Sequence, residues 1–132
     1  MVVEHDIRNN IYFVKEKIHE QTMVLEFEEF DRNLNTIYYN VYLSVYTKRK
    51  NADYNENNCL VTGKYPFETV SKVIRAFNEI EKEIIESKSD FKKYIYVGYV
   101  DNKRRNTYFR YLSKKGYQYG FYDNKKCIYK IY

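Results

Sequence analysis

The sequence predicts an α+β fold in which one mostly antiparallel sheet carries two main helices on one face. Three observations lead to this fold class. Several segments alternate apolar and polar residues, two longer segments repeat with helical period, and neighbouring strands precede the main helices. The predicted order of elements is α-β-β-β-α-β-α-β-β. A chain of 132 residues is most simply one domain, so we expect a single domain over residues 1–132.

Residues 4–19 are predicted to form a short amphipathic helix. Asp6 is a candidate cap, because a carboxylate can accept hydrogen bonds from the free backbone N–H groups at the start of a helix. Four aliphatic residues follow one another at helical spacings: Ile7, Ile11, Val14 and Ile18.

The next two segments predict an antiparallel hairpin. Apolar residues alternate with glutamates in 23–30, and β-branched and aromatic residues dominate the alternating segment 37–47. The sequence "DRNLNT" between them is rich in residues that favour turns. A polar loop over 48–58 and a short third strand over 59–63 are expected to follow.

The remaining elements include the two main helices. Segment 67–87 is predicted as a long helix, with this apolar stripe: Phe67, Val70, Val73, Ile74, Phe77, Ile80, Ile84 and Ile85. Segment 93–100 predicts a strand, and 102–115 predicts a second helix that ends at Gly116. The sequences "YQYGFY" and "CIYKIY", separated by "DNKK", predict a closing hairpin.

The composition narrows the class of protein. The formal net charge is +5 and the isoelectric point is about 9.0, a mild excess that is compatible with an acidic partner. The chain contains no apolar run of the ~18 residues needed to span a membrane, and its first residues lack the apolar core of a signal peptide. Cys59 and Cys127 form no metal or redox motif. We therefore expect a cytoplasmic protein with reduced thiols and no membrane contact.

The predicted helix over 102–115 concentrates the positive charge of the chain. Arg104 and Arg105 fall in its first turn, where free N–H groups and the helix dipole favour an anion over a cation. A phosphate would therefore be favoured there. The predicted ligand-binding residues are Lys103, Arg104, Arg105, Arg110 and Lys114, with Lys115 close by. The alternative is a solvated helix face whose arginines pair with glutamates of the 67–87 helix.

The strand over 37–47 supplies a second candidate surface. Tyr38, Asn40, Tyr42 and Tyr46 share one of its faces, and this face is open if the helices cover the other. Exposed tyrosines suit a contact with a host protein or with a second copy of the chain, and they can stack on bases. Cross-strand aromatic pairing on a solvated sheet is the structural alternative.

No catalytic residue, metal ligand or cofactor is predicted. His5 and His19 have no third ligand at a suitable spacing, and no Ser or Cys is placed near a His as a nucleophile would be. Glu26, Glu28 and Glu29 lack a visible acid partner and fit a solvated strand face. These residues favour a protein that is not an enzyme.

Two resemblances add to this interpretation. From Gly63 onward, the helix, the strand and "DNKRRNTYFRYLSKKGY" resemble the second half of the GNAT acyltransferases, with Asn102, Tyr111 and Gly116-Tyr117 at the matching positions. That resemblance implies acyl-CoA binding, although "TGKYPFET" has one Gly and a Pro where that family has a Gly-rich pyrophosphate loop. Residues 23–120 also resemble small phage and bacterial proteins with a strand hairpin, a "TG" turn, a long helix, a strand and an "RR…Y.R" helix. This second resemblance implies a phage or mobile-element origin.

The sequence therefore predicts a small, basic, non-enzymatic binding protein. The leading expectation is contact with a nucleotide or nucleic acid through the 102–115 helix. A protein-interaction or inhibitor module acting through the Tyr-rich face, alone or as a homodimer, is the alternative. A divergent GNAT-like acyltransferase is the third expectation.

Overall fold

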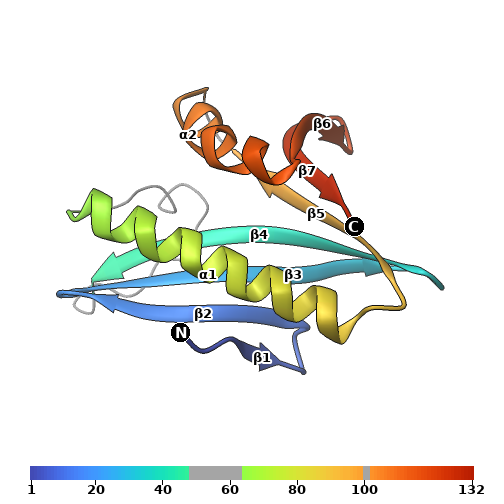
Figure 1. Cartoon of the computed structure of the whole chain (residues 1–132), viewed down its shortest axis with the longest axis horizontal. Coiled ribbons are helices and arrows are strands. Elements are labelled where there is room, and N and C mark those ends of the chain that lie inside the picture. Colours follow the sequence, from blue (N-terminus) through green and yellow to red (C-terminus); the bar gives the residue numbers. More distant parts are fainter. Residues whose placement is uncertain (48–63, 100–101) are drawn as a thin grey trace. The chain divides into compact units, whose positions relative to one another are not determined.

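In the computed structural model, residues 1–47, 64–99 and 102–132 are described. Within them seven strands form one mostly antiparallel sheet in the order β1-β2-β3-β4-β5-β7-β6, and two helices pack against it (Figure 1). This confirms the predicted α+β class. The elements are β1 Glu4–Asp6, β2 Ile11–Ile18, β3 Gln21–Arg32, β4 Thr36–Thr47, α1 Pro66–Ser87, β5 Lys92–Gly98, α2 Asn102–Leu112, a 3₁₀ turn Ser113–Lys115, β6 Gln118–Tyr122 and β7 Lys125–Ile131.

The chain divides into two compact units. Unit 1 consists of Met1–Glu28 and Tyr42–Ser89, and unit 2 consists of Glu29–Val41 and Asp90–Tyr132. Strands β3 and β4 each contribute to both units. The predicted third strand over 59–63 lies outside the described residues, as does the loop over 48–58.

The helix predicted over 4–19 is wrong, because these residues form β1, a turn and β2. The Asp6 carboxylate does accept backbone N–H groups, at 3.1 Å from Arg8 and 3.2 Å from Asn9, but it closes a turn instead of opening a helix. Asn10 then adopts a left-handed conformation with φ 55°. From Ile11 onward, alternate side chains such as Tyr12 and Val14 are buried, so a period of two prevails over the helical spacing of the aliphatic residues.

Unit 1 buries its core between α1 and the inner strands. The rings of Phe27 on β3 and Phe77 on α1 meet edge to face at 5.0 Å, and Ile80 and Ile84 are fully buried. The predicted stripe of the 67–87 helix is confirmed in these turns. It fails at the start of the helix, where Phe67 is 90% exposed and Val70 is 39% exposed. Among the described helices, none is long and apolar enough to cross a membrane.

Unit 2 contains the parallel pair of the sheet and the predicted closing hairpin. Thr36–Val41 of β4 runs parallel to Lys92–Val97 of β5, and β7 pairs antiparallel with both β5 and β6. Asp123 and Asn124 form the two-residue hairpin turn with φ values of 51° and 62°. Positive φ at both positions gives the primed turn geometry that matches strand twist. The buried aliphatic and aromatic side chains of this unit include Ile37, Tyr39, Ile95, Leu112, Tyr117 and Ile128.

Gly116 ends the second helical segment, as predicted. It adopts φ 89°, and its N–H donates to the Ser113 carbonyl at 3.1 Å. We expect Gly116→Ala to lower the free energy of unfolding by about 1–2 kcal/mol, because a side chain disfavours left-handed backbone. Urea unfolding measures the loss. Gly98→Ala is the matched control, since nothing lies within 4 Å of its added Cβ and its φ is not positive. Equal losses in both variants would contradict this explanation.

Candidate functional site

The charge of the chain is divided unequally between the two units. Unit 2 contains twelve Lys and Arg and five Asp and Glu, a formal excess of +7. Unit 1 contains eleven Lys and Arg and thirteen Asp and Glu, a formal charge of −2. The positive excess of the whole chain therefore belongs to unit 2.

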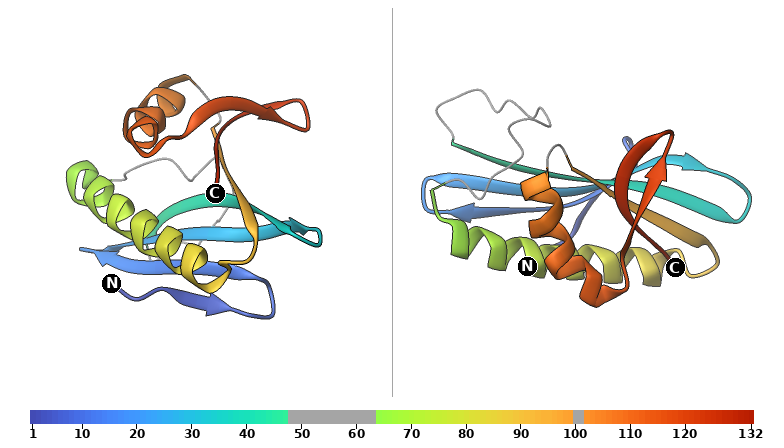
Figure 2. Two further views of the ribbon diagram at one scale, coloured as in Figure 1. Left: turned by 45° about the vertical axis from the view of Figure 1, so that its right-hand side comes forward. Right: turned by 90° about the horizontal axis from the view of Figure 1, so that it is seen from above.

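Helix α2 lies beside the β6–β7 hairpin within unit 2 (Figures 1 and 2). The Phe109 ring stacks on the Tyr119 ring of β6, with centroids 4.0 Å apart and 14° between planes. One helical turn earlier, the Arg105 guanidinium lies 5.7 Å from the centroid of the same ring. Spacing of four residues places Arg105 and Phe109 on one side of the helix, so both meet the hairpin.

The guanidinium of Arg105 is oriented by its neighbour. Its Nε and Nη2 atoms donate to the Asn106 carboxamide oxygen, each at 3.3 Å. The side chain is half-buried. A cation held against an aromatic ring can present its remaining donors to an anion with less loss of rotamer freedom.

The other predicted ligand-binding residues also fall on α2 or just after it. Lys103 and Arg104 lie in the first turn, which contains no acidic residue. Arg110 and Lys114 are exposed. The Lys115 ammonium lies 6.0 Å from the centroid of the Tyr111 ring. On the same helix Tyr108 is half-buried and Leu112 is buried.

The aromatic side chains of β6 were missed as site residues by sequence reasoning. Tyr119 is 47% exposed and Phe121 is 71% exposed. Phe121 pairs directly with Lys126 of β7, whose side chain is exposed. We call Arg105, Phe109, Tyr119, Phe121 and Lys126 the basic–aromatic surface. The signal was the alternation in "YQYGFY", which places Tyr119 and Phe121 on one face of the strand.

The opposite face of the sheet in unit 2 carries a second group of rings, which we call the tyrosine cluster. Its members are Phe30, Tyr38, Tyr94, Tyr96, Tyr122 and Tyr129. Tyr96 is central, with its centroid 4.9 Å from that of Tyr122 and 6.2 Å from that of Tyr129. Burial raises the pKa of Tyr96 to about 12. The Tyr96 hydroxyl is therefore a neutral packing group at physiological pH.

The predicted partner-binding residues divide between the two units. Tyr38 belongs to the tyrosine cluster, where its ring lies 5.0 Å from that of Tyr94. Asn40 is in unit 2, whereas Tyr42 and Tyr46 are in unit 1. All four of these side chains are half-buried. Ring-on-ring packing therefore accounts structurally for Tyr38.

An exposed hydrogen-bonded network in unit 1 was not predicted. His19, at φ 57° in the β2–β3 turn, contacts the Glu68 carboxylate at 3.0 Å. The Tyr65 hydroxyl donates to the Glu20 carboxylate at 2.7 Å, and that bond lowers the pKa of Glu20. The Lys64 ammonium lies 3.5 Å from the same carboxylate. These contacts join the turn to the start of α1, which is a structural role.

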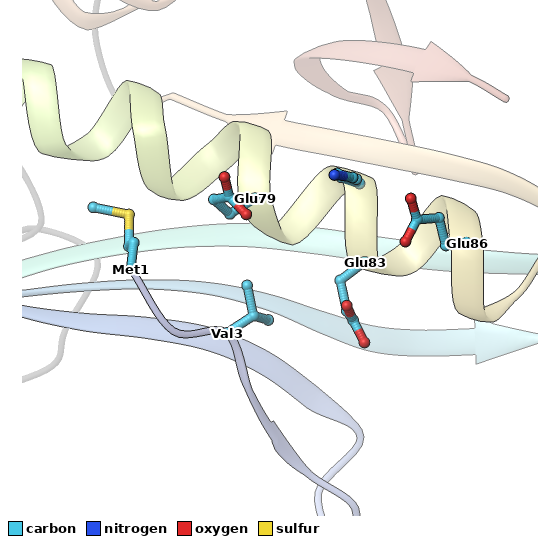
Figure 3. Close-up of a pocket in the computed structure, with 6 residues that line it drawn as sticks. Met1, Val3, Glu79, Glu83 and Glu86 are labelled. Carbon is cyan, nitrogen blue, oxygen red and sulfur yellow. The ribbon is translucent and has the colours of Figure 1, made fainter.

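A surface pocket of 280 Å³ lies on α1 in unit 1 (Figure 3). Three glutamates of one helix face line it together with Met1, Val3 and Lys82: Glu79, Glu83 and Glu86. No group of His, Cys, Asp and Glu able to hold a metal ion is found among the described residues. Cys127 is buried, and burial raises the pKa of its thiol, which disfavours a nucleophilic thiolate.

The helix, strand and helix that carried the GNAT resemblance are present as α1, β5 and α2. Asn102 begins α2, Gly116 ends the following 3₁₀ turn and Tyr117 is buried. Of the "TGKYPFET" segment, the structure describes Lys64 onward. In comparisons with protein family models, curated proteins and solved structures, no match to the chain is found. Any function of this chain is therefore inferred from its own residues and their geometry.

Proposed function

We propose that this protein binds a phosphate-bearing ligand, a nucleotide or a nucleic acid, through α2 and the adjoining hairpin of unit 2. The observation that carries the proposal is the excess charge of +7 in unit 2, against −2 in unit 1. Such an asymmetry raises the local concentration of anions and accelerates their association.

The distribution of side chains on α2 supports the same ligand class. Arg105, Arg110 and Lys114 have no acidic neighbour on the helix, since α2 and the 3₁₀ turn contain no Asp or Glu. A structural helix face would place such cations beside carboxylates at positions three or four away. Here the first turn instead combines cations with a positive helix end, which costs free energy unless an anion is bound.

Binding of fluorescein-labelled oligonucleotides and of fluorescent nucleotides, followed by anisotropy over a range of NaCl concentrations, tests the proposal. We expect affinity to fall linearly on a log–log plot as salt rises, because each neutralised phosphate releases a counterion. For an oligonucleotide, the combined substitutions Arg105→Ala, Arg110→Ala and Lys114→Ala should flatten the slope by about 2, because each neutralised phosphate of a single strand contributes ~0.7 to it.

A matched variant of unit 1 controls for the loss of charge. Lys15→Ala, Arg75→Ala and Lys82→Ala together remove three exposed cations from unit 1 and should leave the affinity and the salt slope nearly unchanged. If both triple variants weaken binding equally, attraction to the overall charge explains it and α2 is not the site. Absence of binding to every nucleotide and oligonucleotide at low salt would refute the proposal outright.

A further inference from the structure

Tyr119 and Phe121 project from the side of the hairpin that α2 covers. Residues two apart on a strand share a face, and Tyr119 on this face contacts Phe109 of α2. Their direct partners on β7 are Ile128, which is buried, and Lys126, which is exposed. Strand β6 therefore presents the rings of Tyr119 and Phe121 side by side, and the cation of Lys126 lies beside Phe121 near the hairpin turn.

The two rings differ in how they are held. The stacked Phe109 ring, with centroids 4.0 Å apart, supports one face of Tyr119. Phe121 is 71% exposed and leaves most of its ring surface to solvent. An exposed Phe beside an oriented Tyr is unfavourable in water but provides stacking surface for a planar ligand.

The charge around these rings specifies the ligand. Residues 102–132 contain nine Lys and Arg and one acidic residue, Asp123. A ligand that fits both features combines flat rings with negative groups between them, which is the chemistry of nucleic acid. An acidic peptide could pair its carboxylates with these cations, but it could stack on Tyr119 and Phe121 only through aromatic residues of its own.

The spacing of the rings favours single strands over duplexes. Side chains two residues apart on a strand are separated by about 7 Å. Neighbouring bases in a duplex are about 3.4 Å apart and are stacked on each other. Two platforms at the wider spacing therefore suit bases that have been splayed apart, as in single strands.

Building on the proposed function, we infer that the basic–aromatic surface binds single-stranded nucleic acid. Successive bases stack on Tyr119 and Phe121, and the intervening phosphates contact Arg105 and Lys126. Sequence preference is weak, because every base offers a ring face to an aromatic side chain.

The experiment compares a short labelled oligothymidylate with a labelled duplex of the same number of phosphates, at each of several NaCl concentrations. We expect the single strand to bind more tightly. Phe121→Ala should weaken single-strand binding about 10-fold while leaving the salt slope unchanged, because no charge is removed. Lys126→Ala should reduce that slope by about 0.7. Phe67→Ala removes a comparably exposed ring from unit 1 and should change nothing.

The outcomes separate this inference from the proposed function. Equal binding of single strand and duplex, unaffected by Phe121→Ala but weakened by the triple substitution on α2, overturns the inference and leaves phosphate binding intact. If the unsubstituted protein binds no polyanion, both the inference and the proposed function are overturned. Polyglutamate that competes as well as oligothymidylate overturns nucleic acid as the ligand. Far-UV circular dichroism melting should show the Phe121→Ala variant folded, because this side chain is largely exposed.

Discussion

Phe27→Ala should lower the free energy of unfolding by about 3–5 kcal/mol. The Phe27 side chain is fully buried in unit 1, and its ring meets that of Phe77 edge to face at 5.0 Å. Truncation removes the transfer free energy of the ring and the van der Waals attraction around the cavity left behind. Since small domains are stable by about 5–15 kcal/mol, this loss is a large fraction of the total, and urea unfolding measures it.

Two further variants keep this prediction testable. Phe67→Ala truncates a ring that is 90% exposed and should change stability by less than about 0.5 kcal/mol. Phe27→Leu retains most of the buried volume and should show a smaller loss if the alanine variant does not fold. A Phe27→Ala protein as stable as Phe67→Ala would mean that α1 does not pack on β3 as described.

Gly120→Ala should destabilise the protein by about 1–3 kcal/mol through overpacking. A Cβ added at Gly120 would overlap the Tyr129 ring, with 2.7 Å to its Cδ1 atom and a closer approach to Cε1. The ring cannot simply turn away, because its hydroxyl accepts a hydrogen bond from Gln118 at 3.3 Å and it stacks near Tyr96. Thermal unfolding followed by circular dichroism reports the loss.

A double-mutant cycle identifies the cause. In a Tyr129→Ala background the overlap disappears, so Gly120→Ala should there be neutral or slightly stabilising. Gly98→Ala on β5 has open space around its added Cβ and serves as the control. If the stability losses of Gly120→Ala and Tyr129→Ala simply add, the Tyr129 ring does not explain why position 120 requires glycine.

Much of the fold follows from the sequence because its periodicities are unambiguous in the longer elements. In the sequence, the stripe of α1 and the alternation of β4 each match one period over many residues, and the burial of β4 follows that alternation over residues 37–40. The N-terminal segment was misassigned because its aliphatic residues fit helical spacings, although Tyr12, Val14 and Ile18 also fit the period of two of a strand. In the structure β2 pairs with β1 on one side and with β3 on the other, and this pairing favours the strand over the helix. The pairing depends on neighbouring strands, so it cannot be read from the segment alone.

Only part of the candidate site could be predicted from the sequence. The cations of α2 could be found by counting charge along one helix. The exposed rings of β6 could not be recognised in the same way, since alternation gives the face of a strand but not which face is covered. The contact between Phe109 and Tyr119, which joins the two halves, depends on where α2 ends and where the hairpin begins.

The parallel pairing of β4 with β5 has a consequence for the order of folding. Its register joins Thr36 to Lys92 across 56 positions of sequence, so closing it carries a large entropic cost and is expected to be slow. The β6–β7 hairpin, with its two-residue turn, is expected to form within microseconds. Arg105, Phe109, Tyr119, Phe121 and Lys126 all lie within 22 consecutive residues around that hairpin. The segment that carries the basic–aromatic surface is therefore expected to organise before the parallel pairing of β4 with β5.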